Sequence, residues 1–146
     1  MGVRDKFSDP DNLQIVNAIR AAEYATSGEI RVHIEERCSI GPLDRAAYLF
    51  RKLEMDKTEL RNGVLFYLAM KDRKFAIIGD SGINQSVPEG FWDDVYKLVT
   101  EYFRKGDIPG GLSEGIILAG NQLKAHFPLS ADDKNELTDE VSYGED

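Results

Sequence analysis

The chain has 146 residues, the length of one ordinary domain, which can bury roughly two thirds of its unfolded surface without disulfides or metals. Its formal net charge of -8 argues against a general nucleic-acid binder and against anionic membranes, because no run of the sequence gathers Lys and Arg. The single cysteine, Cys38, excludes an internal disulfide, and two histidines are too few for a His- or Cys-rich zinc site. Carboxylates that hold a hard cation remain compatible with this composition.

The first part of the chain predicts a helix followed by a strand. Ser8 or Asp9 can cap a helix that has Pro10 in its first turn and an apolar stripe reaching Thr26. Residues 29–36 then alternate between apolar and polar side chains, which is typical of a half-exposed strand at the edge of a sheet. His33 lies on the polar side of this strand, so we expect it to be solvated.

A second helix and a pair of buried strands come next. Gly41 and Pro42 break the chain before a helix that ends near Met55. Residues 64–70 and 75–78 are almost continuously apolar and are joined by the polar turn 71–73, which predicts two buried strands in a hairpin. The order strand, helix, strand implies a parallel crossover, and the hairpin partner is then antiparallel to both strands.

Two more helices and an acidic tail complete the chain. Pro88 begins the third helix, residues 106–111 break the chain, and Leu112 begins a fourth helix that reaches His126. Residues 130–146 carry seven acidic side chains against one lysine, so the tail holds most of the net charge. We therefore predict a single domain at 1–129 and an acidic C-terminal extension at 130–146. The predicted fold is a three-layer α/β/α sandwich with a small mixed sheet and about four helices.

The sequence shows neither a signal peptide nor an apolar run of the roughly 20 residues that span a bilayer. The expectation is a cytoplasmic chain without membrane insertion.

The strand order predicts a cluster of acidic side chains at one rim of the sheet. Glu29 and Asn62 stand at the start of the two parallel strands, and Asp80 follows the end of the antiparallel one. Asp94 lies on the flank of the third helix, and Asp107 joins the cluster only if the loop after that helix returns to the same rim. Oxygen ligands that converge from separate elements are what calcium or magnesium requires. The sequence therefore predicts a metal site formed by Glu29, Asp80, Asp94 and Asp107.

Other interpretations of the same residues remain open. Asp80 is also a natural turn residue whose carboxylate accepts hydrogen bonds from nearby backbone N–H groups. Ser81 is a conceivable nucleophile, but no histidine is placed in the sequence to deprotonate it, so a turn hydroxyl is the simpler interpretation. Cys38 stands seven residues before Arg45, one too many for a cysteine-phosphatase loop, and is better explained as a small buried residue at a strand end.

Several short motifs together resemble the TPM domain family. They are A-x-x-x-T-S-G-E-I-R-V at 22–32, T-x-x-R-N-G-V-L at 58–65, D-R-K-F-A-I-I-G-D-x-G at 72–82, F-R-K-G-D-I-x-x-G-L at 103–112, and H-F-P and N-E-L-T-D-E near the end. The resemblance covers nearly the whole chain. It implies an α/β/α sandwich, in agreement with the pattern of strands and helices.

The resemblance also carries expectations about function. The family includes a thylakoid-lumen acid phosphatase, membrane-tethered bacterial proteins and an animal receptor accessory protein, and some members are reported to bind calcium near the sheet rim. We expect a TPM-like domain that binds a divalent cation, calcium rather than magnesium, with weak metal-assisted phosphomonoesterase activity in which Asp80 positions water. The alternative is a protein-interaction module without catalysis, which docks a partner protein through its acidic tail or rim. The sequence offers no activated nucleophile or general base, which favours binding over catalysis.

Overall fold

A four-stranded sheet lies at the centre of the computed structural model, which describes residues 2–129 and 141–144. Its strands are β1 (Glu29–Glu35), β2 (Gly63–Ala69), β3 (Lys74–Gly79) and β4 (Ser142–Tyr143), in the order β3-β2-β1-β4. β1 runs parallel to β2 and to β4, and β2 is antiparallel to β3. The predicted combination of a parallel crossover and an antiparallel hairpin is confirmed.

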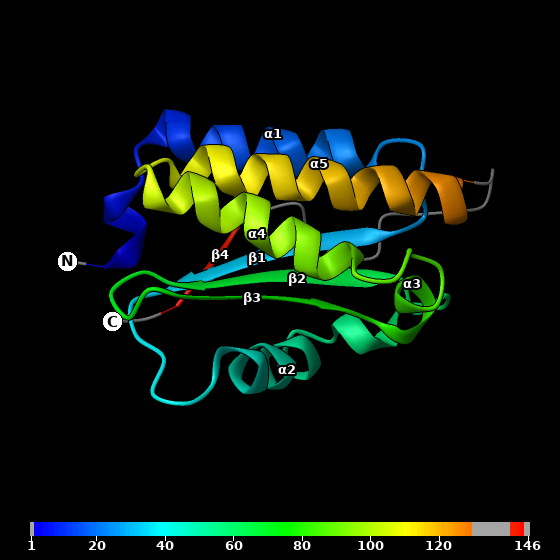
Figure 1. Ribbon diagram of the computed structural model, residues 1–146, viewed down its shortest axis with the longest axis horizontal. Helices are drawn as coiled ribbons and strands as arrows, with labels where there is room; N and C mark the ends of the chain where they lie inside the picture. Colours follow the sequence, from blue (N-terminus) through cyan, green and yellow to red (C-terminus); the bar gives the residue numbers. More distant parts are fainter. Residues whose placement is uncertain (1, 130–140, 145–146) are drawn as a thin grey trace.

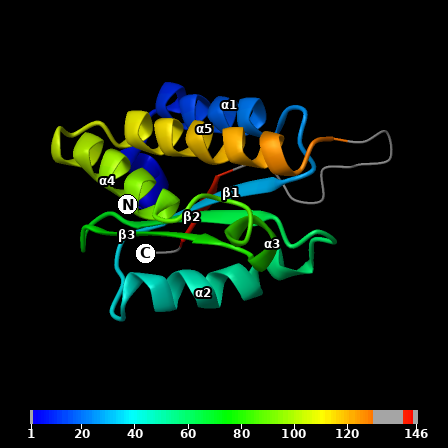
Figure 2. The same cartoon turned by 45° about the vertical axis from the view of Figure 1, so that its right-hand side comes forward.

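Helices cover both faces of the sheet (Figure 1). One face carries α1 (Asp9–Glu23), α4 (Phe91–Arg104) and α5 (Ile108–His126), and the other carries α2 (Pro42–Lys52), as the rotated view in Figure 2 also shows. The described residues add α3 (Ser81–Asn84) and the 3-10 turns η1 (Val3–Lys6) and η2 (Met55–Lys57). Two hydrophobic clusters, one on each side of the sheet, fill the spaces between the layers. The three-layer α/β/α sandwich is therefore confirmed.

Local signals in the sequence explain where the main helices begin. Ser8 and Asp11 form a reciprocal capping box at the start of α1, in which each side chain accepts from the other residue's backbone N–H. Asp107 caps α5 by accepting from the N–H of Gly110. Small residues let α5 approach α1, because a Cβ on Gly120 would lie only 2.5 Å from the Cβ of Ala22. These contacts fix the helical layer over β1.

Three details of the predicted elements were wrong. β1 is an inner strand in the described part of the chain, flanked by β2 and β4, and only Arg31 along it is more than marginally exposed. His33 is accordingly buried, with 6% of its surface exposed, instead of solvated. The third and fourth helices begin at Phe91 and Ile108, because Pro88 lies in the loop before α4 and Asp107 supplies a cap that brings the start of α5 forward.

The acidic extension falls in two parts. Ser142 and Tyr143 pair with His33 and Ile34 of β1, so this piece of the tail belongs to the sheet. Residues 130–140 and 145–146 of the extension lie outside the described residues. No helix in the described ranges is long and apolar enough to cross a membrane.

The strand register defines two ends of the sheet. Glu29 is paired with Gly63, and Val64 with Gly79, so β1 and β2 begin where β3 ends. We call this end, marked by Glu29, Asn62 and Asp80, the acidic rim. The opposite end, where β1 and β2 finish and the turn into β3 lies, is called the hairpin rim.

Candidate functional site

Glu29 and Asp80 lie at the same end of the sheet, as the strand order predicted. Glu29 is the first residue of β1, is 2% exposed, and donates its backbone N–H to the carbonyl of Asn62 at 3.3 Å. Asp80 follows β3 and is 7% exposed. Because β2 lies between their strands, their backbones are separated by two strand spacings, or roughly 10 Å. The acidic rim therefore holds two buried carboxyl groups whose residues belong to strands that are not adjacent in the sheet.

The carboxylate of Asp80 is held by an arginine and by the helix that follows it. Arg61 donates from Nε to Oδ2 at 2.7 Å and from Nη2 to Oδ1 at 2.9 Å, which is the bidentate geometry of a strong ion pair. Asp80 also caps α3, because its Oδ1 accepts from the backbone N–H of Ser81 at 2.7 Å. Asp80 thus has the turn role that the sequence left open, together with an ion pair that the sequence did not indicate.

The cation of this pair lies at the protein surface. Half of the Arg61 side chain is exposed, whereas the side chain of Asp80 is 6% exposed. The hydrogen bonds to Asp80 and the negative charge of that residue raise the pKa of Arg61, and the charge of Asp56 adds to this effect. Arg61 also has a positive φ of 53°, a left-handed conformation that is uncommon for a residue with a side chain. The loop before β2 is therefore shaped so that a cationic group lies against the buried carboxylate.

The other two predicted ligands, Asp94 and Asp107, lie at opposite ends of the sheet. Asp94 is exposed in the first turn of α4, whose neighbour Trp92 donates from Nε1 to Asn84 of α3 at 2.8 Å, so Asp94 is at the acidic-rim end. Asp107 lies at the hairpin rim, since its neighbours Gly106 and Ile108 line a cavity there. Within residues 2–129 and 141–144, no three His, Cys, Asp or Glu side chains form a group that could hold a metal ion.

A cavity of about 340 Å³ adjoins Asp80 on the α2 side of the sheet. Its lining includes Asp56, Asp80, Arg51 and Arg61, and it is otherwise formed by apolar side chains of α2 and the end of β3. The Oδ1 atom of Asp56 is buried and has no hydrogen-bond partner in the described chain. A buried carboxylate oxygen without a partner is costly, and it marks a place where a cation or water would be favourable.

Sequence reasoning missed Asp56 because it lies in the loop between the second helix and the second strand. No spacing rule links it to Asp80, which is 24 positions further along the chain. The turn η2 places it in the lining of the same cavity as Asp80, and only the folded loop reveals this arrangement.

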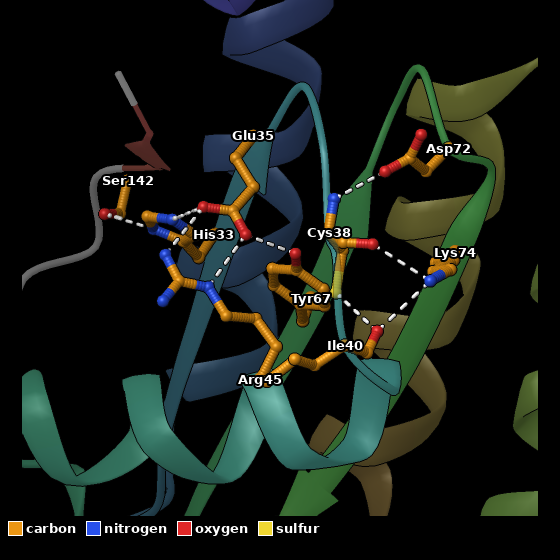
Figure 3. A network of polar contacts seen from close by, with 9 residues as sticks. All are labelled: His33, Glu35, Cys38, Ile40, Arg45, Tyr67, Asp72, Lys74 and Ser142. Atoms are coloured by element: carbon orange, nitrogen blue, oxygen red, sulfur yellow. Dashed lines mark hydrogen bonds and ion pairs between the residues drawn. The ribbon is translucent and has the colours of Figure 1, made fainter. Parts of the chain in front are cut away.

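A second polar cluster lies near the hairpin rim, on the face covered by α2 (Figure 3). Glu35 is at its centre and accepts from Arg45 through Nε at 2.9 Å and Nη2 at 3.0 Å. The hydroxyl of Tyr67 donates to Oε2 of the same carboxylate. His33 lies with Nε2 3.6 Å from Oε1 of Glu35, and its Nδ1 is 2.8 Å from the hydroxyl of Ser142. This cluster links β1, β2, α2 and β4.

Burial and charge set the protonation states of the cluster. Burial lowers the pKa of His33 and outweighs the attraction of Glu35, so His33 is neutral at pH 7. Burial opposes the ionisation of Glu35, but hydrogen bonds from Arg45 and Tyr67 together with the charge of Arg45 outweigh it, so the pKa of Glu35 falls below its ordinary value. Burial and the bond to Glu35 raise the pKa of Tyr67 well above its ordinary range. The cluster is a satisfied ion pair with a neutral histidine beside it.

Cys38 is part of the structural frame around this cluster. It is 3% exposed, which confirms the prediction of a small buried residue, and its thiol donates to the carbonyl of Ile40 at 3.1 Å. Its backbone N–H donates to Oδ2 of Asp72 at 2.7 Å, and Lys74 donates to the carbonyls of Cys38 and Ile40 at 2.9 and 3.1 Å. These bonds attach the loop after β1 to the hairpin turn.

Comparisons with known proteins agree with this architecture. The model of the TPM domain matches residues 4–122. Among solved structures, the NMR structure of the BA42 protein from the psychrophilic bacterium Bizionia argentinensis is 44% identical, covers 94% of this chain and 95% of its own, and has a TM-score of 0.87.

Two more distant structures share the fold. The N-terminal domain of a protein from P. gingivalis is 21% identical, with a TM-score of 0.69 over 85% of this chain and 82% of its own. The N-terminal domain of the cg2496 protein from Corynebacterium glutamicum is 15% identical, with a TM-score of 0.68 over 88% of this chain and 81% of its own. No protein of curated function shows significant similarity to this sequence.

Proposed function

Since this chain belongs to the TPM domain family, we propose that it is a cation-binding domain that takes calcium, with magnesium as the weaker ion, in the cavity beside Asp80. The observation that carries the proposal is the Oδ1 of Asp56, which has no hydrogen-bond partner among the described residues and lies in a cavity that Asp80 also lines. Carboxylates, backbone carbonyls and water are the oxygen ligands that calcium prefers.

The donor set fits the ion in part. Asp56 and Asp80 supply two carboxylates, and calcium fills its remaining coordination positions with carbonyls and water. Arg61 must leave Asp80 for the ion to bind, and its half-exposed side chain can turn into solvent. Arg51 also lines the cavity, but its side chain lies at the surface. We therefore propose an exchange in which Arg61 neutralises Asp80 until the ion takes its place.

Glu29 and Asp94 have a supporting role in this proposal. Both belong to the acidic-rim end, where their charges raise the local concentration of cations without contacting the ion. Asp107 has no part in it, because the hairpin rim is at the far end of the sheet.

Thermal unfolding with and without calcium tests the proposal. A ligand at 100 times its Kd stabilises the folded state by about 2.7 kcal/mol. For a domain of this size, that raises Tm by roughly 5 to 10 °C. Asp56→Asn and Asp80→Asn should each abolish the calcium-dependent increment, whatever their effect on the basal Tm. Glu114→Gln removes the same charge from an exposed position on α5 and should leave the increment intact.

Arg61→Gln tests whether calcium displaces Arg61 from Asp80 or is only attracted by the negative charge of the rim. The substitution removes the competitor for Asp80, so we expect a lower basal Tm and a tighter calcium Kd in a calorimetric titration. An unchanged Tm of the wild-type protein in millimolar calcium, or weaker binding by Arg61→Gln, contradicts the proposal.

Phosphomonoester hydrolysis stays a prediction of the family resemblance. A divalent ion in the cavity would neutralise the charge of a phosphate group, and Asp80 would accept a hydrogen bond from the attacking water. Hydrolysis of p-nitrophenyl phosphate that depends on calcium and disappears in Asp80→Asn would support it, and activity that persists in that variant would contradict it.

Docking of a partner protein is the second candidate function. The observation that favours it is a set of exposed apolar side chains on α2 and in the loop before it, which are about half exposed, namely Ile40, Leu43 and Tyr48. The acidic tail proposed for the same role falls mostly outside the described residues. Cross-linking in cells, compared between the wild-type protein and the variant Leu43→Ser/Tyr48→Ser, tests this function independently of calcium. A cross-linked partner should be lost in the variant.

A further inference from the structure

A groove opens at the hairpin rim, between the β2–β3 hairpin and the C-terminal half of α4. Figure 1 shows α4 crossing the sheet obliquely, so that its end diverges from the hairpin turn, and Figure 2 shows the same divergence from another side. The cavity there measures about 700 Å³, within the range of small-molecule sites. It is larger than the cavity beside Asp80 and shares no lining residue with it.

The lining of this groove is mainly apolar. Its apolar side chains are Leu68, Met70, Phe75, Tyr96, Phe103 and Ile108. Three of the rings hold one another in place, because Phe75 stacks on Tyr96 with centroids 5.6 Å apart and meets Phe103 edge-on at 5.2 Å. Phe75 is buried, whereas 43% of Tyr96 is exposed, so the aromatic wall continues to the protein surface. Such a wall favours a ligand with an apolar body.

Two arginines line the groove together with the apolar wall. Arg73 belongs to the hairpin turn and Arg104 is the last residue of α4, and both line the groove. Both side chains are exposed, and neither makes a hydrogen bond or an ion pair with any part of the chain that the structure describes. Among the residues that the structure describes, no Asp or Glu lines the groove. A doubly cationic groove without acidic groups is unexpected in a chain whose net charge is -8.

We propose that this groove binds a small amphiphile with one carboxylate, of the class of medium-chain fatty acids. The apolar chain would lie along Phe75, Tyr96 and Phe103, and the carboxylate would accept hydrogen bonds from Arg73 and Arg104. The arginine fork matches carboxylate geometry, and burial of the chain supplies the hydrophobic part of the binding energy. A neutral apolar molecule leaves both guanidinium groups unused, and a polyanion does not match the aromatic wall.

Titration with decanoate below its micelle concentration, followed by amide NMR shifts, tests the proposal. We expect saturable shifts for residues of the hairpin and of the second half of α4. Decanol, which has the same chain without charge, should bind at least tenfold more weakly, because it lacks hydrogen bonds to charged groups. Decyl phosphate tests whether the groove prefers a phosphate to a carboxylate head group. If decyl phosphate binds more tightly than decanoate, the assignment to a carboxylate is overturned.

Variants separate the charged from the apolar contribution. Arg73→Gln/Arg104→Gln should weaken decanoate binding about tenfold or more and leave decanol binding unchanged. Thr100→Trp fills the groove and should abolish binding of both decanoate and decanol. Loss of the Thr100 hydroxyl should not prevent the variant from folding, because this hydroxyl bonds only to carbonyls of its own helix. Arg20→Gln, on the exposed side of α1, is the matched control and should bind normally. Equal affinity for decanol and decanoate, or shifts outside the groove, would overturn the proposal.

Discussion

The ion pair between Glu35 and Arg45 gives the sharpest prediction about stability. Glu35→Gln keeps the size of the side chain but removes the negative charge of the carboxylate, which accepts two hydrogen bonds from Arg45 and one from Tyr67. The side chain of Glu35 is 8% exposed, so the neighbouring guanidinium would lose its partner in a largely dry environment. Removal of one partner from a buried ion pair costs about 3 to 5 kcal/mol.

The expected loss lies at the low end of that range. One third of the Arg45 side chain is exposed, so water can partly replace the lost carboxylate. We therefore predict that Glu35→Gln lowers the free energy of unfolding by about 3 kcal/mol. The corresponding decrease in Tm is roughly 10 °C for a domain of this size.

Urea unfolding followed by circular dichroism measures this loss directly. Glu54→Gln is the matched control, because Glu54 forms an exposed pair with Lys57 and should change stability by less than about 0.5 kcal/mol. If Glu35→Gln and Glu54→Gln are equally stable, the cluster near the hairpin rim does not stabilise the fold and the reasoning is refuted.

Three further predictions follow from single positions. The pKa of His33 in the folded protein is lowered from 6.5, so at mildly acidic pH the unfolded chain binds more protons than the folded one. Stability should therefore fall as the pH decreases below about 6.5, and His33→Asn should flatten that part of a curve of Tm against pH. A Cβ on Gly82 would lie 2.2 Å from the carbonyl oxygen of Leu60, so Gly82→Ala should cost more than about 2 kcal/mol in urea unfolding, whereas Gly41→Ala, which meets only a side chain at 3.4 Å, should be close to neutral. Asp107→Ala removes the cap of α5 and should cost about 1 kcal/mol, with no change in calcium affinity.

The sequence was sufficient to predict the layers and the relative order and direction of β1, β2 and β3, but not the addition of β4 beside β1. The unbroken apolar runs at 64–70 and 75–78 could only be buried strands, and the polar turn between them required a hairpin. The helix between β1 and β2 then required a parallel crossover, which placed Glu29 and Asp80 at one rim. These inferences succeeded because they depend on periodicity and chain connectivity, which are local properties.

The polar cluster near the hairpin rim could not be predicted in this way. Alternation along β1 made His33 and Glu35 appear to face water, but α2 covers that face and brings Arg45 to the carboxylate. The tail adds Ser142 beside His33 from 109 positions away, and no local pattern indicates that pairing. Long-range pairs of this kind are decided by how the layers pack, so the burial of a polar strand face is visible only in the fold.

The same limit applies to the candidate cation site. The position of Asp80 after a strand could be read from the sequence. Its ion pair with Arg61 could not, because Arg61 lies in the loop before β2 and has a left-handed backbone conformation there. Asp56 reaches the cavity through a 3-10 turn that no motif in the sequence announced.

A calcium titration of the wild-type protein followed by amide NMR shifts tests the central claim most directly. The proposal predicts saturable shifts at Asp56, Arg61 and Asp80, with release of the Arg61 side chain visible in its own guanidinium resonance. Shifts confined to the acidic residues of the tail, with the signals of these three residues unchanged, would contradict it.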